Sequence, residues 1–202
     1  SSAGAGAAAA AGYGPLHIGT DIGGSLRLPA GWCGIFTLKP SLGRIPIDPP
    51  YMGRAAGPMT RTVADAALMM APLSLADARD SMSLPPEAID WSGFDVGVEH
   101  LRGLRIGLLL DAGCGLAVEP EIRAAVEHAA RLFERAGAIV EPMQPFMTQT
   151  MLDGMDHLWR MRSRVDMNAL RPDQRAKVLP YIRQWADSAE GFSGEHVFRD
   201  FR

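Results

Sequence analysis

The sequence is poor in lysine. Of its 20 basic residues all but Lys39 and Lys177 are arginine, and no run of basic residues occurs. The formal net charge is −3. A surface that binds nucleic acid or an anionic membrane needs clustered cations to meet the phosphates. We therefore expect a small molecule, rather than nucleic acid or a membrane, as the partner of this chain.

Cysteine is equally scarce. Cys33 and Cys114 lie far apart, without a Cys-x-x-Cys motif or a histidine at zinc-ligand spacing. The histidines share no spacing with one another: His17, His100, His128, His157 and His196. We thus expect no metal and no cofactor, and the cysteine usage predicts a reducing, cytoplasmic location. No apolar stretch is long enough to span a membrane, and no signal peptide is visible.

What the sequence does contain is typical of a folded globular protein. Hydrophobic side chains make up 47% of its 202 residues, enough for a sizeable core, and one globular domain is the starting expectation. The first residue is Ser1 rather than methionine. From this start we expect a processed chain or a piece of a longer one.

The first third of the chain predicts alternating helices and strands. Residues 4–11 are nearly all alanine and glycine, which favours a helix packed closely against a neighbour. "PLHIGT" and "GIFTLKPS" read as short strands on either side of a glycine-rich loop. "MTRTVADAALMMAPL" predicts a threonine-capped helix that ends before Pro72.

Residues 104–142 predict a β-α-β unit. "LRIGLLL" and "AIVEP" read as strands around a helix with Gly137 just past its end. The apolar positions of that helix follow its period: Ile122, Ala125, Val126, Ala129, Leu132, Phe133 and Ala136. From residue 151 onward the pattern is helical. The fold class we predict is α/β, with a mixed, largely parallel sheet flanked by helices and a helical C-terminal region.

The loop "DIGGS" at residues 21–25 carries the strongest chemical signal. Glycines let a loop present backbone N–H groups to an oxyanion, and Ser25 could act as a nucleophile beside them. The alternative is a glycine-rich turn that cradles a phosphate. A Walker A motif is excluded because no Gly-Lys-Ser/Thr is present, and "GAGAAA" only approximates a dinucleotide fingerprint.

Four segments in order carry a resemblance to a known family. They are "SSAGAGAAAA", "GTDIGGSLRLP", "LKPS" and "GPMTRTVAD". Together they resemble the amidase signature family, serine hydrolases that cleave amides with a Ser-cisSer-Lys triad. The resemblance is specific through residue 70. It implies that residues 1–202 form a partial amidase domain, with a signature core at 1–70, the β-α-β unit at 104–142 and a helical substrate wall at 151–202.

The resemblance also implies roles for individual residues. Ser25 would be the nucleophile that carries the acyl group, and Ser1 the bridging serine, joined to Ser2 by a cis peptide bond. The oxyanion would be bound by the backbone N–H groups of Ile22, Gly23, Gly24 and Ser25, with Ser2 beside the substrate. Thr20, Asp21 and Arg27 would hold the loop in shape without taking part in the chemistry.

Two departures from the family pattern stand out. Ala3 and Gly4 replace the usual Gly-Gly pair, and Ala5 replaces a common serine. More important, the family places its catalytic lysine upstream of the Ser-Ser pair, where this chain begins. Lys39 matches another family position and Lys177 lies in the divergent region. We therefore expect an internal fragment of a longer amidase that is inactive alone.

Three functions remain open at this point. The first is hydrolysis of a carboxylic amide through a serine acyl-enzyme. The second is the amidotransferase branch of the same family, in which ammonia from glutamine or asparagine passes to a misacylated tRNA. The third is a non-catalytic scaffold that keeps the amidase core. The short connection "IPIDPPYMGRAAGPM" looks unlike the amidotransferase branch.

Overall fold

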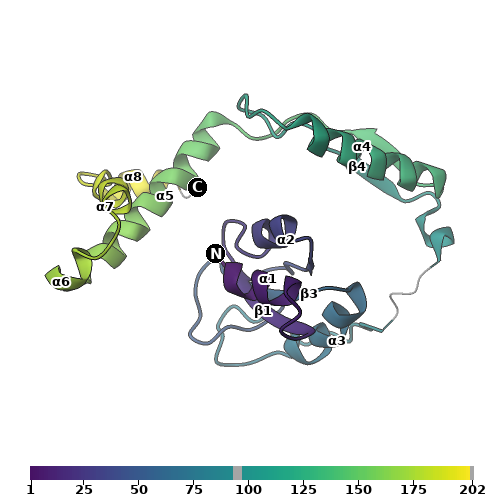
Figure 1. Ribbon diagram of the computed structural model, residues 1–202, viewed down its shortest axis with the longest axis horizontal. Coiled ribbons are helices and arrows are strands. Elements are labelled where there is room, and N and C mark those ends of the chain that lie inside the picture. The colour runs from purple at the N-terminus through teal and green to yellow at the C-terminus, as the bar shows by residue number, and fades with distance from the viewer. Residues whose placement is uncertain (93–96, 201–202) are drawn as a thin grey trace. The chain divides into compact units, whose positions relative to one another are not determined.

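The computed structural model describes residues 1–92 and 97–200 (Figure 1). The chain divides into two compact units, Ser1–Gly97 and Val98–Arg202. The expectation of one partial amidase domain stays a prediction. The predicted signature core at 1–70 lies in the first unit. The predicted β-α-β and helical segments at 104–142 and 151–202 lie in the second.

The first unit is a three-stranded sheet with helices on its faces. Its elements are α1 (Ala3–Ala10), β1 (Leu16–Asp21), α2 (Arg27–Cys33), β2 (Phe36–Thr37), β3 (Ala55–Thr60) and α3 (Val63–Leu73). The strand order is β1-β3-β2, and both pairings are antiparallel. The expectation of a largely parallel sheet is wrong for this unit. The central strand β3, which the sequence pattern did not predict, runs opposite to both of its neighbours.

Glycines on β1 and β3 allow Ser2, Leu26 and Leu38 to pack closely against the sheet. Gly19 pairs with Gly57 across the two strands. A Cβ on Gly19 would meet Ser2 and Leu26 at 2.7 and 2.8 Å, and one on Gly57 would overlap the Leu38 carbonyl oxygen. The paired glycines therefore leave the space in which the fully buried Leu26 packs.

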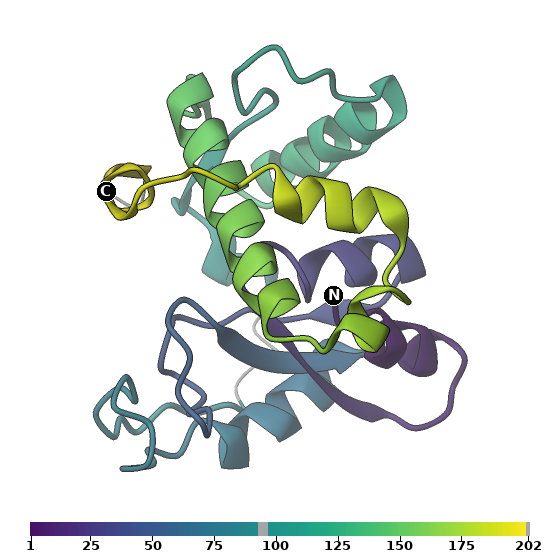
Figure 2. The same cartoon turned by 90° about the vertical axis from the view of Figure 1, so that its left-hand side faces the viewer.

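The helix α3 covers the opposite face of this sheet (Figure 2). There Met70 packs with Ala56 and Ile45 in a buried apolar cluster. Thr62 is the N-cap, as predicted, and its side chain accepts a hydrogen bond from the Asp65 N–H. The helix does not end before Pro72. It continues to Leu73, because Pro72 removes only one backbone N–H donor. The helical hydrogen bonds resume at Ser74, whose N–H donates to the Met70 carbonyl.

The second unit begins with a short 3₁₀ helix (Val98–Leu101) and the predicted β-α-β unit. The strands β4 (Arg105–Leu108) and β5 (Ile139–Pro142) pair in parallel, with α4 (Pro120–Arg135) between them in sequence. Gly137, just past the helix, has a φ of 93°, which suits glycine. The predicted β-α-β unit is confirmed in both the type and the order of its elements.

Helices follow to the end of the described chain. They are α5 (Gln149–Asn168), α6 (Pro172–Arg175), α7 (Pro180–Asp187) and α8 (Gly194–Asp200), and α5 packs against both α7 and α8. No strand occurs after Pro142 among the described residues. A role for residues 151–202 as a substrate wall stays a prediction. None of the helices that the structure describes is long and apolar enough to cross a membrane.

Candidate active site

Ser25 lies in the turn that connects β1 to α2. The residue is half-buried, and its neighbour Gly24 is buried with a φ of 117°, a conformation that a residue with a side chain rarely adopts. A Cβ on Gly24 would also approach Leu28 to 3.1 Å. The turn therefore depends on glycine directly before the serine, as the pattern in the sequence indicated.

The carboxylate of Asp21 organises this turn. It accepts hydrogen bonds from the backbone N–H groups of Gly24, Leu26 and Arg27, at 2.8, 3.1 and 3.4 Å. It also accepts two from the Arg27 guanidinium, at 3.0 and 2.9 Å. The Asp21 side chain is fully buried, whereas that of Arg27 is 55% exposed. One side chain thus fixes the loop from the end of β1 to the start of α2.

These contacts also set the charge state of Asp21. Burial alone would raise the pKa of the carboxyl, but the Arg27 guanidinium and the three N–H groups outweigh it and hold the pKa well below its usual range. The same pairing raises the pKa of Arg27. Asp21 is therefore ionised, and its carboxylate accepts hydrogen bonds from the loop. This fits the predicted supporting role.

The N–H of Gly24 has a different partner from the one expected. It donates to Asp21 Oδ1, so it is not available to bind an oxyanion. Within the described residues, the N–H groups of Ile22, Gly23 and Ser25 make no hydrogen bond. The prediction that Gly24 belongs to the oxyanion hole is corrected accordingly: three of the four expected donors remain free.

Ser2 is held against the loop through both its backbone and its side chain. Its N–H donates to the carbonyl oxygen of Ser25 at 3.1 Å. Its Oγ accepts from the Thr20 N–H at 2.9 Å and donates to the Thr20 carbonyl at 3.1 Å. The start of α1 is thus bonded to both ends of the "TDIGGS" segment. Thr20 takes part through its backbone, which agrees with a supporting role.

The predicted cis bond between Ser1 and Ser2 is wrong. Asp48–Pro49 is the sole cis peptide bond in the part of the chain that the structure describes, so the Ser1–Ser2 bond is trans. A cis bond before a residue other than proline costs about 3 kcal/mol. The hydrogen bonds of Ser2 form with the trans bond, which avoids that cost. Ser1 itself is exposed, and its side chain makes no hydrogen bond to any described residue.

Neither lysine is hydrogen-bonded to Ser25 in the described part of the chain. Lys39 is exposed and donates from Nζ to the Pro40 carbonyl at 3.0 Å. Lys177 is exposed in the second unit. Among the described residues, no side chain that could act as a base is hydrogen-bonded to Ser25. The candidate site in the first unit therefore consists of the Ser25 hydroxyl, backbone N–H groups and the side chains that support them.

A second cluster of reactive side chains lies in the helical region and was not anticipated. His157, His196 and Asp200 converge to within 4.8 Å of one another. The expectation of unrelated histidines considered their spacing from one another and from Ser25, and not from aspartate. The pattern His-x-x-x-Asp at 196–200 places two ligand-type side chains on one face of a helix and could have indicated the pair.

Comparison with known proteins identifies the family. Residues 1–193 match the sequence profile of the Amidase family. The chain therefore belongs to the amidase family, which confirms the resemblance drawn from the four signature segments. A bacterial aryl acylamidase of the amidase signature family is 31% identical, with a TM-score of 0.80 over 98% of this chain and 43% of that chain.

Further relatives extend this result. A glutamyl-tRNA(Gln) amidotransferase subunit from Rubrobacter xylanophilus is 43% identical over 69% of this chain and 30% of its own length. Its counterpart from Staphylococcus saprophyticus is 40% identical over 70% and 29%. A 6-aminohexanoate cyclic dimer hydrolase has a TM-score of 0.82 at 24% identity over 99% of this chain and 44% of its own, which supports the fold alone. The chain spans less than half of each of these proteins.

Proposed function

We propose that the protein containing this chain hydrolyses a carboxylic amide through an acyl-enzyme on Ser25. The observation that carries the proposal is the serine's place in a glycine-rich loop whose N–H groups at Ile22, Gly23 and Ser25 make no hydrogen bond in the described chain. Ser25 Oγ attacks the amide carbonyl and the amine leaves with a proton. Water then attacks the ester and releases the carboxylic acid, which restores the hydroxyl.

In this proposal the loop stabilises the oxyanion that forms during both steps. The donors are the N–H groups of Ile22, Gly23 and Ser25, which are free of other partners in the described chain. Gly24 contributes its conformation, and Asp21 with Arg27 holds the donors in place. Ser1 passes the proton between Ser25 and the base, and Ser2 lines the substrate side of the loop.

The base is expected outside this chain. A serine hydroxyl is a weak nucleophile without a base, and Lys39 is engaged with the Pro40 carbonyl. The proposal therefore assigns the base to a lysine elsewhere in the complete protein and predicts that residues 1–202 alone are inactive. The two free thiols, Cys33 and Cys114, support a cytoplasmic setting.

A fluorophosphonate probe tests the assignment directly, because it labels only an activated serine. We expect the complete protein to be labelled on Ser25, and Ser25→Ala to lose both labelling and amide turnover. Ser41→Ala is the matched control, since Ser41 is an exposed serine in a loop of the same unit. Labelling that persists in Ser25→Ala would contradict the assignment, and a protein that is never labelled would favour the scaffold.

An amidotransferase remains the second candidate because the relatives from Rubrobacter and Staphylococcus carry that name. Its first half-reaction uses the same acyl-enzyme, with glutamine as the amide and ammonia as the leaving group. Supplying glutamine and glutamyl-tRNA(Gln) to the complete protein separates the two. Transfer of ammonia to the tRNA would establish the amidotransferase, whereas cleavage of simple amides without transfer supports the hydrolase.

A further inference from the structure

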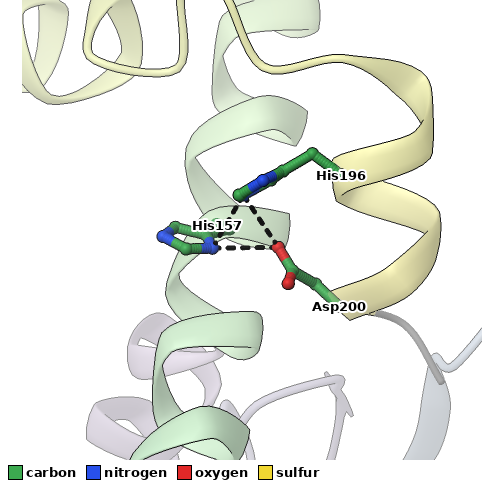
Figure 3. Close-up of side chains that lie close together, drawn as sticks. All are labelled: His157, His196 and Asp200. Atoms are coloured by element: carbon green, nitrogen blue, oxygen red, sulfur yellow. Dashed lines mark hydrogen bonds and ion pairs between the residues drawn. The ribbon is translucent and has the colours of Figure 1, made fainter.

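Two helices of the second unit bring three ligand-type side chains to one point. His157 lies on α5, and His196 and Asp200 lie one turn apart on α8 (Figure 3). We propose that these residues form a three-ligand site for a divalent transition-metal ion, Zn²⁺ foremost, which fastens α8 to α5. The proposal is independent of the amide chemistry at Ser25.

The distances among the three ligand atoms match those around a small metal ion. His157 Nδ1 lies 2.9 Å from Asp200 Oδ2, and His196 Nε2 lies 3.2 Å from each of those atoms. Tetrahedral zinc with bonds of about 2.0–2.2 Å keeps its ligand atoms about 3.3–3.6 Å apart. The three atoms therefore form one face of such a tetrahedron after a shift of a few tenths of an ångström.

The packing around the cluster holds the ligands in place. A Cβ on Gly154, on the same face of α5 one turn before His157, would lie 3.0 Å from the backbone oxygen of Asp200. The absence of a side chain there lets the end of α8 lie close against α5. Phe192 packs its ring on both imidazoles, with centroids 5.0 and 4.8 Å away. The three ligand residues are each only partly exposed.

The donor set selects the class of ion. Two imidazole nitrogens and one carboxylate oxygen suit zinc and its neighbours, whereas calcium and magnesium prefer oxygen ligands alone. The alternative is an ordinary ion pair in which both histidines share the Asp200 carboxylate. That arrangement leaves the nitrogens of His157 and His196 only 3.2 Å apart, whereas a bound cation accepts a lone pair from each.

Titration of the metal-free, complete protein tests the site. We expect one equivalent of Zn²⁺ to bind and to raise the melting temperature. Co²⁺ should give the intense visible bands of a tetrahedral ion. X-ray absorption of the Zn²⁺-loaded wild type should show two imidazoles and one carboxylate in the first shell. This last measurement needs no variant, so it stays decisive if a substitution disturbs folding.

The variants assign the ligands. His196→Ala should weaken Zn²⁺ binding by about 100-fold or more, because even outer-shell partners of a metal ligand contribute 10–100-fold. Its matched control is His100→Ala, an exposed histidine of the same unit outside the cluster, which should leave the affinity unchanged. Wild type that binds Zn²⁺ no more tightly than His196→Ala, or a first shell of oxygen atoms only, would overturn the proposal.

Discussion

The backbone N–H of Ser2 donates to the backbone carbonyl of Ser25 across 3.1 Å. This bond connects the first turn of α1 to the loop between β1 and α2 without using either serine hydroxyl. The Oγ of Ser25 makes no hydrogen bond to any described residue, whereas that of Ser2 is bonded to Thr20. This difference supports the proposed nucleophile at Ser25 and gives Ser2 a role in holding the loop.

The first prediction separates Ser1 from Ser2. In the complete protein, Ser1→Ala should lower amide turnover by about 100-fold or more, the usual contribution of a positioned proton carrier, with unchanged stability. Ser2→Ala should instead lower the free energy of unfolding by about 1 kcal/mol, since the Thr20 N–H loses its acceptor. Turnover and urea unfolding of both variants make the comparison. Full turnover in Ser1→Ala would remove the bridging role.

The second prediction concerns the glycine pair on the sheet. Gly57→Ala should destabilise the protein by about 2 kcal/mol or more, because its Cβ would overlap the Leu38 carbonyl oxygen and press on Leu26. The matched control is Gly31→Ala in α2, where a Cβ meets nothing within 4 Å. That substitution should stabilise by about 0.5–1 kcal/mol through helix propensity. Thermal unfolding of both variants checks the opposite signs.

The third prediction concerns Asp21. Asp21→Asn should lower the free energy of unfolding by about 3 kcal/mol, because an amide in place of the carboxylate leaves buried donors unpaired and turns an NH₂ toward them. Asp77→Asn is the control, since Asp77 also pairs with an arginine, Arg79, but in an exposed loop. Denaturant titration measures both. Equal effects of the two substitutions would contradict the organising role of Asp21.

The fourth prediction is the pH dependence that follows from the same carboxyl. Its pKa is lowered by folding, so its contribution is fully present above the unfolded value of about 3.9 and is lost as the pH falls below it. The difference in stability between wild type and Asp21→Asn should be constant at neutral pH and shrink below about pH 4. Urea unfolding at several pH values measures this difference. A gap that widens on acidification would refute the assigned charge state.

The parts of the fold that sequence reasoning could reach are those with a strong local signal. The β-α-β unit follows from the helical period of residues such as Ile122 and Val126 between two apolar runs, and Thr62 marks the start of α3 through cap chemistry. The loop around Ser25 was found because its glycines and serine lie within a few positions of one another. Each of these signals lies within a single stretch of the chain.

The strand β3 could not be reached in this way. Its sequence "AAGPMT" holds alanine, glycine and proline, which are poor strand formers, and Pro58 lies in a strand with neighbours on both sides. The strand exists because its small residues fit between packed layers, and Gly57 can lie against Leu38 and Leu26. Tertiary packing therefore overrides local propensity here, and with β3 the antiparallel order of the sheet was also missed.

Sequence reasoning found the loop between β1 and α2 but not the hydrogen bonds within it. Sequence reasoning placed Asp21 and Arg27 as supports, and their pairing fits that role. It also assigned the Gly24 N–H to the oxyanion, whereas this N–H donates to the side chain of Asp21, three residues earlier. Which partner an N–H finds depends on the path of the loop. That path follows from a buried carboxylate and a glycine φ rather than from residue type alone.

The network around Asp21 implies a sharp contrast between neighbouring amides in hydrogen exchange. Protons on Gly24, Leu26 and Arg27 are sequestered by one carboxylate and should exchange slowly, whereas those on Ile22 and Gly23 have no acceptor in the described chain. The loop is thus held in shape before any ligand binds. A ligand that reaches the open amides would slow their exchange without ordering the loop, so little entropy would be lost on binding.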